Sequence, residues 1–135
     1  MRKLLSSLAL LAALFIAAPA VFMAAPALAF EVIPYAKPAA EAAIASGKPV
    51  LLEVYASWCP TCQAQHEAVL SMKDEAAYRN FAVFQIDFDG QKDVVKALKV
   101  PRSTLILYKG GKEITRESWG ATKEDVARVL MMGTK

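Results

Sequence analysis

The chain contains two cysteines, Cys59 and Cys62, which are separated by two residues in the stretch WCPTC. Two thiols at this spacing can serve as a structural disulfide, as part of a metal site, or as a redox couple. A disulfide between them closes so short a loop that it removes little entropy from the unfolded chain, which disfavours a purely structural role. Metal binding and disulfide exchange are therefore the chemistries to weigh.

A metal site would need ligands besides the two thiols. His66, the only histidine of the chain, lies four residues after Cys62 and so on the same face of a helix. Zinc and copper sites usually have a fuller set of Cys and His ligands, and no second cysteine pair exists. A non-catalytic redox-sensing or metal-binding module that uses Cys59, Cys62 and His66 is the alternative to a redox couple.

The two cysteines fall where one expected element ends and the next begins. The run PVLLEVYA at 49–56 predicts a buried strand, and PTCQAQHEAVLSMK at 60–73 predicts a helix with proline at its first position. Cys59 then lies beside the free N–H groups of the helix, which favour a thiolate. This placement predicts an exposed, acidic Cys59 as the nucleophile and a more sheltered Cys62 as the resolving thiol.

One charged residue, Glu53, interrupts the apolar strand, six residues before Cys59. Side chains alternate between the two faces of a strand, so Glu53 lies on the same face as Leu51 and opposite Leu52. If helices cover both faces of the sheet, Glu53 is a buried carboxylate. The alternative is a glutamate near the strand end that reaches water.

The rest of the chain alternates between strand-like and helix-like segments. Strands are expected at 30–35, 49–56, 81–88, 103–109 and 112–119, and helices at 38–47, 60–73, 91–99 and 122–132, with a short helical piece at 74–80. Thr122 is the expected N-cap of the last helix, with Asp125 three residues later. This alternation predicts an α/β fold in which helices cover both faces of the sheet.

The first 29 residues resemble a targeting segment. Arg2 and Lys3 precede a long Leu- and Ala-rich run, and ALA at 27–29 fits a signal peptidase site. We expect a Sec-type signal peptide that is cleaved after Ala29; if it is not cleaved, residues 4–25 would anchor the protein in a membrane. In both cases the domain at 30–135 lies in the periplasm or is secreted, where disulfides can persist.

The charge balance gives no support for a nucleic-acid partner or for binding to an acidic membrane surface. The chain has 16 Lys and Arg residues against 13 Asp and Glu residues. Two of the basic residues belong to the leader, so the remainder is almost neutral. Such a balance does not favour nucleic-acid binding or a polybasic membrane surface.

The segment YASWCPTCQAQ resembles the active-site segment of thioredoxin-like proteins. The strand VLLEVYA that leads into it and the later strand VFQIDFD resemble two strands of their sheet. The segment TLILYKGGKE resembles their late hairpin. The resemblance covers nearly all of 30–135. It implies a thioredoxin-like fold, with a central mixed sheet of four to five strands between helices. It also implies a monomeric thiol-disulfide oxidoreductase that needs no metal or cofactor. Its partners would be protein thiols and disulfides, with an unidentified electron donor or acceptor that is either soluble or membrane-bound. The CPTC form and the leader are more similar to periplasmic members.

The resemblance also assigns roles to single residues. In this family an acid at the position of Glu53 lies beneath the resolving cysteine and assists its proton transfer. Trp58, beside Cys59, would form part of the partner-contacting surface, together with Pro60 and Thr61 between the cysteines. The alternative for Trp58 is an aromatic side chain that serves packing only.

The segment KVPRSTLILYK departs from the family pattern. Thioredoxin-like proteins have a cis-proline just before the late strand, whereas Ser103 stands at that position here and Pro101 lies two residues earlier. We expect Ser103 to face Cys59 and Pro101 to be an ordinary loop proline; the alternative is that Pro101 is the cis residue, with a longer connection. Because a cis bond before a residue other than proline costs about 3–4 kcal/mol, the bond before Ser103 is expected to be trans. Arg102 beside it would contact partners and bias the site toward acidic ones; the alternative is an exposed loop arginine without such a role.

Overall fold

The computed structural model describes residues 29–135, which form a five-stranded mixed sheet covered by helices. The strands are β1 (Val32–Pro34), β2 (Val50–Tyr55), β3 (Ala82–Asp87), β4 (Thr104–Lys109) and β5 (Lys112–Ser118), in the spatial order β1-β3-β2-β4-β5. β1 and β2 run parallel to β3, while β4 is antiparallel to both β2 and β5. The central strand β2 therefore has hydrogen-bonded neighbours on both sides.

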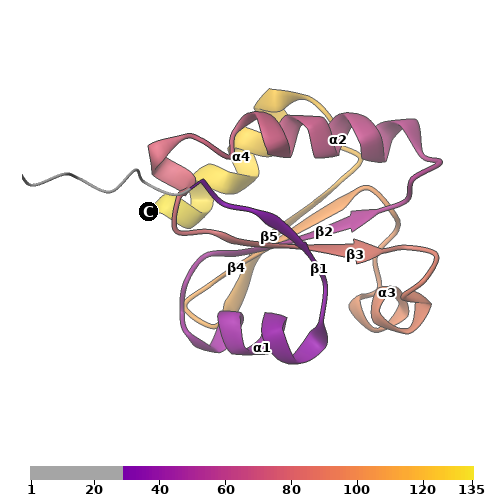
Figure 1. The fold of residues 1–135 in the computed structure, drawn as a ribbon, viewed down its shortest axis with the longest axis horizontal. Coiled ribbons are helices and arrows are strands. Elements are labelled where there is room, and N and C mark those ends of the chain that lie inside the picture. The colour runs from indigo at the N-terminus through magenta and orange to yellow at the C-terminus, as the bar shows by residue number, and fades with distance from the viewer. Residues whose placement is uncertain (1–28) are drawn as a thin grey trace, which may run out of the picture.

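Two helices cover each face of the sheet (Figure 1). The helices are α1 (Lys37–Ala45), α2 (Pro60–Ser71), α3 (Lys92–Leu98) and α4 (Lys123–Thr134), with a short 3-10 helix, η1 (Ala76–Tyr78). α2 and α4 lie on one face, and α1 and α3 lie on the other. Every expected element is present with its ends within two residues of the predicted ones, and the predicted fold class is confirmed.

Side chains of β2 contribute to both cores. Leu51 packs in the core beneath α2 and α4, whereas Leu52 and Val54 pack in the core beneath α1 and α3. All three are at most 2% exposed, as expected for a strand whose two faces are covered. Because side chains alternate along a strand, Glu53 lies on the α2 side, with Leu51.

Local signals set the beginnings of α2 and α4. Cys59 is the N-cap of α2, with Pro60 at the first helical position, where the missing N–H costs no hydrogen bond. The Thr122 side chain accepts from the Asp125 N–H, and Asp125 accepts from the Thr122 N–H, which completes the predicted capping box. The start of α2 lies at the carboxyl end of β2, on the right-hand side of Figure 1.

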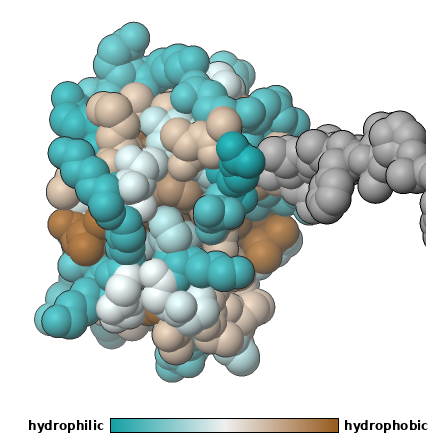
Figure 2. All heavy atoms as spheres, turned by 90° about the vertical axis from the view of Figure 1, so that its left-hand side faces the viewer, coloured by the Kyte–Doolittle hydropathy of each residue, from teal (hydrophilic) through white to brown (hydrophobic). Residues whose placement is uncertain are grey.

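The opposite end of the molecule is mainly polar. Figure 2 shows this left-hand side of Figure 1, where hydrophilic side chains surround small, separated apolar patches. No helix within residues 29–135 is long and apolar enough to cross a membrane. The leader expected at 1–29 lies, except for its last residue, outside the described residues.

Candidate active site

The two thiols lie at the first turn of α2. The backbone of Cys59 is extended (φ −96°, ψ 111°), and its Sγ accepts a hydrogen bond of 3.2 Å from the Cys62 N–H. Both cysteines are free thiols in this structure. The first-turn N–H groups and the helix dipole therefore act on Cys59, as the strand–helix junction predicts.

The expectation of an exposed Cys59 is wrong. Only 2% of Cys59 is exposed, and Cys62 is 1% exposed. Cys59 clusters with Ala56 and Cys62, and Phe88, from the segment after β3, packs against this cluster. The sequence does not reveal that Phe88 packs against the thiols, because Phe88 follows a different strand.

The environments of the two thiols shift their pKa values in opposite directions. Burial disfavours the Cys59 thiolate, but hydrogen bonds with Cys62 and Arg102, and the positive charge of Arg102, lower the pKa of Cys59 below its ordinary value. Burial raises the pKa of Cys62, and its hydrogen bond with Cys59 raises it further. Near neutral pH the thiolate therefore forms preferentially on Cys59.

Ser103, in the segment just before β4, lies beside the two thiols. The described chain contains no cis peptide bond, so the bond before Ser103 is trans, and Ser103 has a left-handed backbone (φ 55°). Its N–H donates to the Val54 carbonyl at 2.9 Å. The Ser103 backbone opposes the rise in the pKa of Cys62, whereas Arg102 lowers the pKa of Cys59. Ser103 thus lies beside the CxxC pair through Cys62, with Arg102 beside Cys59, and the contact of either residue with a partner stays a prediction.

Ser103 offers a test of this backbone geometry. A left-handed conformation costs a residue with a Cβ about 1–2 kcal/mol, and Ser103 Oγ is buried without a hydrogen-bond partner. We expect Ser103→Gly to raise the free energy of unfolding. Ser103→Pro should lower it by about 3 kcal/mol or more, since proline fixes φ near −65° and removes the N–H bonded to Val54. Urea unfolding of both variants measures this contrast; a Ser103→Pro variant as stable as wild type would contradict it.

Glu53 is buried and fully engaged in hydrogen bonds. Its exposed fraction is 1%, so the alternative of a glutamate that reaches water is wrong. His66 Nδ1 lies 2.9 and 3.1 Å from the two Glu53 carboxylate oxygens, and Gln85 Nε2 donates to Oε2 at 3.1 Å. His66 belongs to α2 and Gln85 to the neighbouring strand β3. Glu53 is therefore the buried member of a hydrogen-bonded pair with His66.

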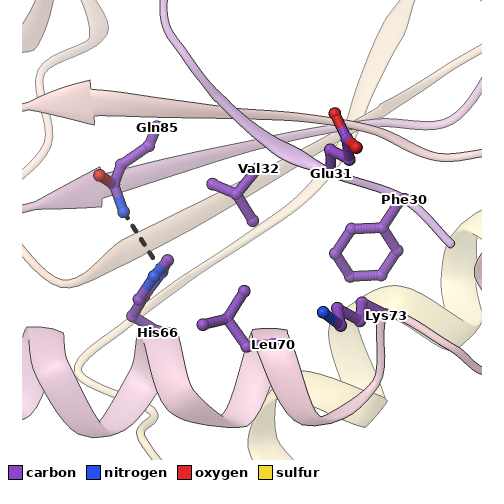
Figure 3. Close-up of a pocket in the computed structure, with 7 residues that line it drawn as sticks. All are labelled: Phe30, Glu31, Val32, His66, Leu70, Lys73 and Gln85. Carbon is purple, nitrogen blue, oxygen red and sulfur yellow. Dashed lines mark hydrogen bonds between the residues drawn. The ribbon is translucent and has the colours of Figure 1, made fainter.

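His66 connects this pair with the surface. A pocket of about 400 Å³ (Figure 3) is lined by Phe30, Glu31, Val32, His66, Leu70, Lys73 and Gln85. His66 and Gln85 point toward one another at one end of it, and 24% of the His66 side chain is exposed. The hydrogen bond to Glu53 raises the pKa of His66 above its ordinary value, although burial opposes this. His66 therefore joins the buried Glu53 carboxylate to the surface pocket.

The same contacts argue against the alternative metal site. Within residues 29–135, no three His, Cys, Asp or Glu side chains converge as metal ligands. His66 is on the helix that begins at Cys59, but its Nδ1 is engaged by Glu53 rather than by the thiols. The predicted three-ligand set of Cys59, Cys62 and His66 is not assembled.

The surface beside Cys59 is aromatic. Trp58 is 56% exposed, as a partner contact requires and a packing aromatic would not be, and its Nε1–H donates to Asp89 at 2.6 Å. Pro60 is also exposed, and Thr61 is half-buried. Sequence reasoning missed a second exposed tryptophan, Trp119, which reaches this surface from the end of β5.

Gln85 and Trp119 were missed for the same reason. Gln85 is opposite Glu53 only through the register of β2 and β3, and Trp119 meets Arg102 only because β5 pairs with β4. A polar residue within the expected strand 81–88, and a tryptophan immediately before a glycine, were the available signals. Neither identifies a contact without the strand pairing.

The observed sheet and site define a class of protein. A mixed sheet between two helical layers, with a free CxxC pair at the start of the helix after the central strand, is the arrangement of a thiol-disulfide oxidoreductase. The thioredoxin family model matches residues 31–131. The chain belongs to the thioredoxin family.

Individual relatives agree with this assignment. Thioredoxin-2 of Saccharomyces cerevisiae is 36% identical over 78 residues, which are 56% of this chain and 73% of the yeast protein. The thiol:disulfide interchange protein DsbE of Yersinia pestis is 59% identical over 27 residues, but the match covers only 20% of this chain and 14% of DsbE. The crystal structure of Trxlp from Edwardsiella tarda superposes with a TM-score of 0.71 at 38% identity, covering 74% of this chain and 98% of that one.

Proposed function

We propose that this protein exchanges disulfides with protein thiols through a Cys59–Cys62 redox couple, with Cys59 as nucleophile and Cys62 as resolving thiol. The observation that carries the proposal is the first turn of α2, where Cys59 Sγ accepts the Cys62 N–H at 3.2 Å. Arg102 adds a positive charge at the same sulfur. Both interactions favour the thiolate, which is the reactive species.

In the reducing direction the exchange has two steps. The Cys59 thiolate attacks one sulfur of the partner disulfide, a Cys59–partner bond forms, and the partner's second sulfur leaves as a thiolate that takes a proton from water. Cys62 then loses its proton and attacks Cys59, so the Cys59–Cys62 disulfide forms and the partner's remaining sulfur leaves as a thiolate. Two electrons pass from the protein to the partner. In the oxidising direction the same steps reverse.

The second step needs an acceptor for the Cys62 proton. We assign this role to the Glu53–His66 pair, since Glu53 is buried on the α2 side of β2 and His66 joins it to a surface pocket. A proton that reaches Glu53 can leave through His66. The pair thus replaces the single buried carboxylate that the sequence suggested.

A leader at residues 1–29 would place this chemistry outside the cytoplasm. Residues 1–29 have the composition of a signal peptide, or of an anchor at 4–25 if they are retained. DsbE of Yersinia pestis, one of the relatives, is described as a thiol:disulfide interchange protein. We infer a periplasmic or secreted protein that acts as a monomer on protein thiols and receives or delivers electrons through a second, unidentified protein.

A redox titration tests the couple. The purified protein is equilibrated in thiol buffers of defined potential and free thiols are alkylated and counted, with tryptophan fluorescence as a second signal. We expect a reversible two-electron transition between about −270 and −120 mV, with the lower end marking a reductant and the upper end an oxidant. The Cys59→Ser/Cys62→Ser variant controls for unrelated fluorescence changes. Thiols that stay reduced or stay oxidised across the whole range would overturn the proposal.

A further inference from the structure

An arginine lies between two exposed tryptophans beside Cys59. The Arg102 guanidinium carbon is 4.8 Å from the centre of the Trp58 ring and 5.1 Å from that of Trp119. Both rings lie within the range of cation–π attraction, and 56% of Trp58 and 47% of Trp119 is exposed. We call Trp58, Arg102 and Trp119 the Trp–Arg–Trp surface.

The surface is held in place by its neighbours. Trp58 Nε1 is bonded to Asp89, and the Trp119 N–H donates to the Ser103 carbonyl at 2.7 Å. Trp119 has a φ of 71°, a conformation that a bulky residue adopts at an energetic cost. The large exposed side chain of Trp119 is therefore kept beside Arg102 by backbone contacts rather than by burial.

Arg102 has no carboxylate partner within the described part of the chain. The ion pairs found there involve other basic side chains. The carboxylate of Asp89 accepts a hydrogen bond from Trp58 Nε1. Arg102 Nε is buried without a hydrogen-bond partner. The nearby anion is the Cys59 sulfur when it is ionised.

That anion disappears during the reaction. When Cys59 forms a mixed disulfide, its sulfur loses the negative charge that faced Arg102. A guanidinium in a partly dry site then lacks a counter-charge, which is unfavourable. A carboxylate on the partner restores the balance at this point, and the two indole rings offer apolar faces to the partner chain around it. Arginine and tryptophan are also the residue types that most often dominate protein contacts.

We propose that the Trp–Arg–Trp surface recognises an acidic side chain next to the reacting cysteine of a protein partner, so that acidic segments are the preferred substrates. The inference rests on the proposed disulfide exchange and adds its substrate class. Arg102 is the specificity-determining residue, and the tryptophans hold its guanidinium in position.

The test compares three disulfide-bonded peptides that differ only in the residue after the reacting cysteine: Glu, Gln or Lys. For the purified, reduced protein at low ionic strength we expect kcat/KM to be about tenfold higher for the Glu peptide than for the Lys peptide. The ratio should shrink as salt screens the charge. Equal rates for the three peptides would overturn the inference and leave the proposed function intact, whereas no reduction of any peptide would overturn both.

Two variants separate recognition from reactivity. Arg102→Gln should slow all three peptides, because the Cys59 thiolate loses a stabilising charge, but it should also bring the Glu-to-Lys ratio close to one. Arg116→Gln is the matched control, since Arg116 lies on β5 paired with Glu113, and the ratio should persist in it. An Arg102→Gln variant that keeps the tenfold ratio would overturn the assignment. The ratio is independent of a general loss of reactivity or of partial unfolding.

Discussion

Replacing Cys59 with serine is expected to abolish disulfide exchange, with a fall in kcat/KM of about a thousandfold or more. A serine hydroxyl is not ionised at neutral pH and cannot form a mixed disulfide, whatever the contributions of α2 and Arg102. Cys62→Ser should instead retain the first step and stop at the mixed disulfide, because the resolving thiol is missing. Non-reducing electrophoresis with a disulfide-bonded protein substrate distinguishes a trapped adduct from none.

The two serine variants are matched controls for each other. Both remove one sulfur atom from the same buried cluster, and Cys59 and Cys62 are 2% and 1% exposed. Similar stability with opposite trapping would support the assigned roles. An adduct trapped by Cys59→Ser and not by Cys62→Ser would reverse the order of the two thiols.

Replacing His66 with leucine is expected to lower the free energy of unfolding by about 3 kcal/mol, because it removes the charged partner of the buried Glu53 carboxylate and leaves only the Gln85 amide as a side-chain donor. The Glu53→Leu/His66→Leu double variant should recover most of this loss, since an apolar pair carries no unpaired charge. The free energy of unfolding of His66→Gln, which keeps a donor for Glu53, should lie between those of wild type and His66→Leu. Urea denaturation at fixed pH measures all three variants, and a double variant less stable than His66→Leu would contradict the pairing.

The same pair predicts how stability changes with pH. Hydrogen bonding to Glu53 raises the pKa of His66 in the folded protein above the unfolded value of about 6.5. The folded state then binds the proton more tightly, so the contribution of His66 is fully present below about pH 6.5 and is lost as the pH rises through the folded pKa. The stability difference between wild type and His66→Gln should therefore shrink over this range. A difference that grows with pH would contradict the prediction.

Features that depend on neighbouring residues were predictable from the sequence. The ends of the elements followed from prolines, glycines, caps and apolar periodicity, and the Thr122–Asp125 capping box formed as expected. The position of Cys59 before Pro60, at the first turn of a helix, also needed no knowledge of distant contacts. The burial of Glu53 followed from alternation in a strand with both faces covered.

Features that depend on distant residues were decided by the tertiary structure. The sequence by itself determined a thioredoxin-like fold with two thiols at a helix start, because backbone preferences act over a few residues. Only strand pairing could set Gln85 beside Glu53 and bring Trp119 to Arg102. The same packing placed Phe88, which follows β3, against the cluster of Ala56, Cys59 and Cys62. These contacts join residues that are far apart along the chain, and their register is set by how the sheet and helices pack as a whole.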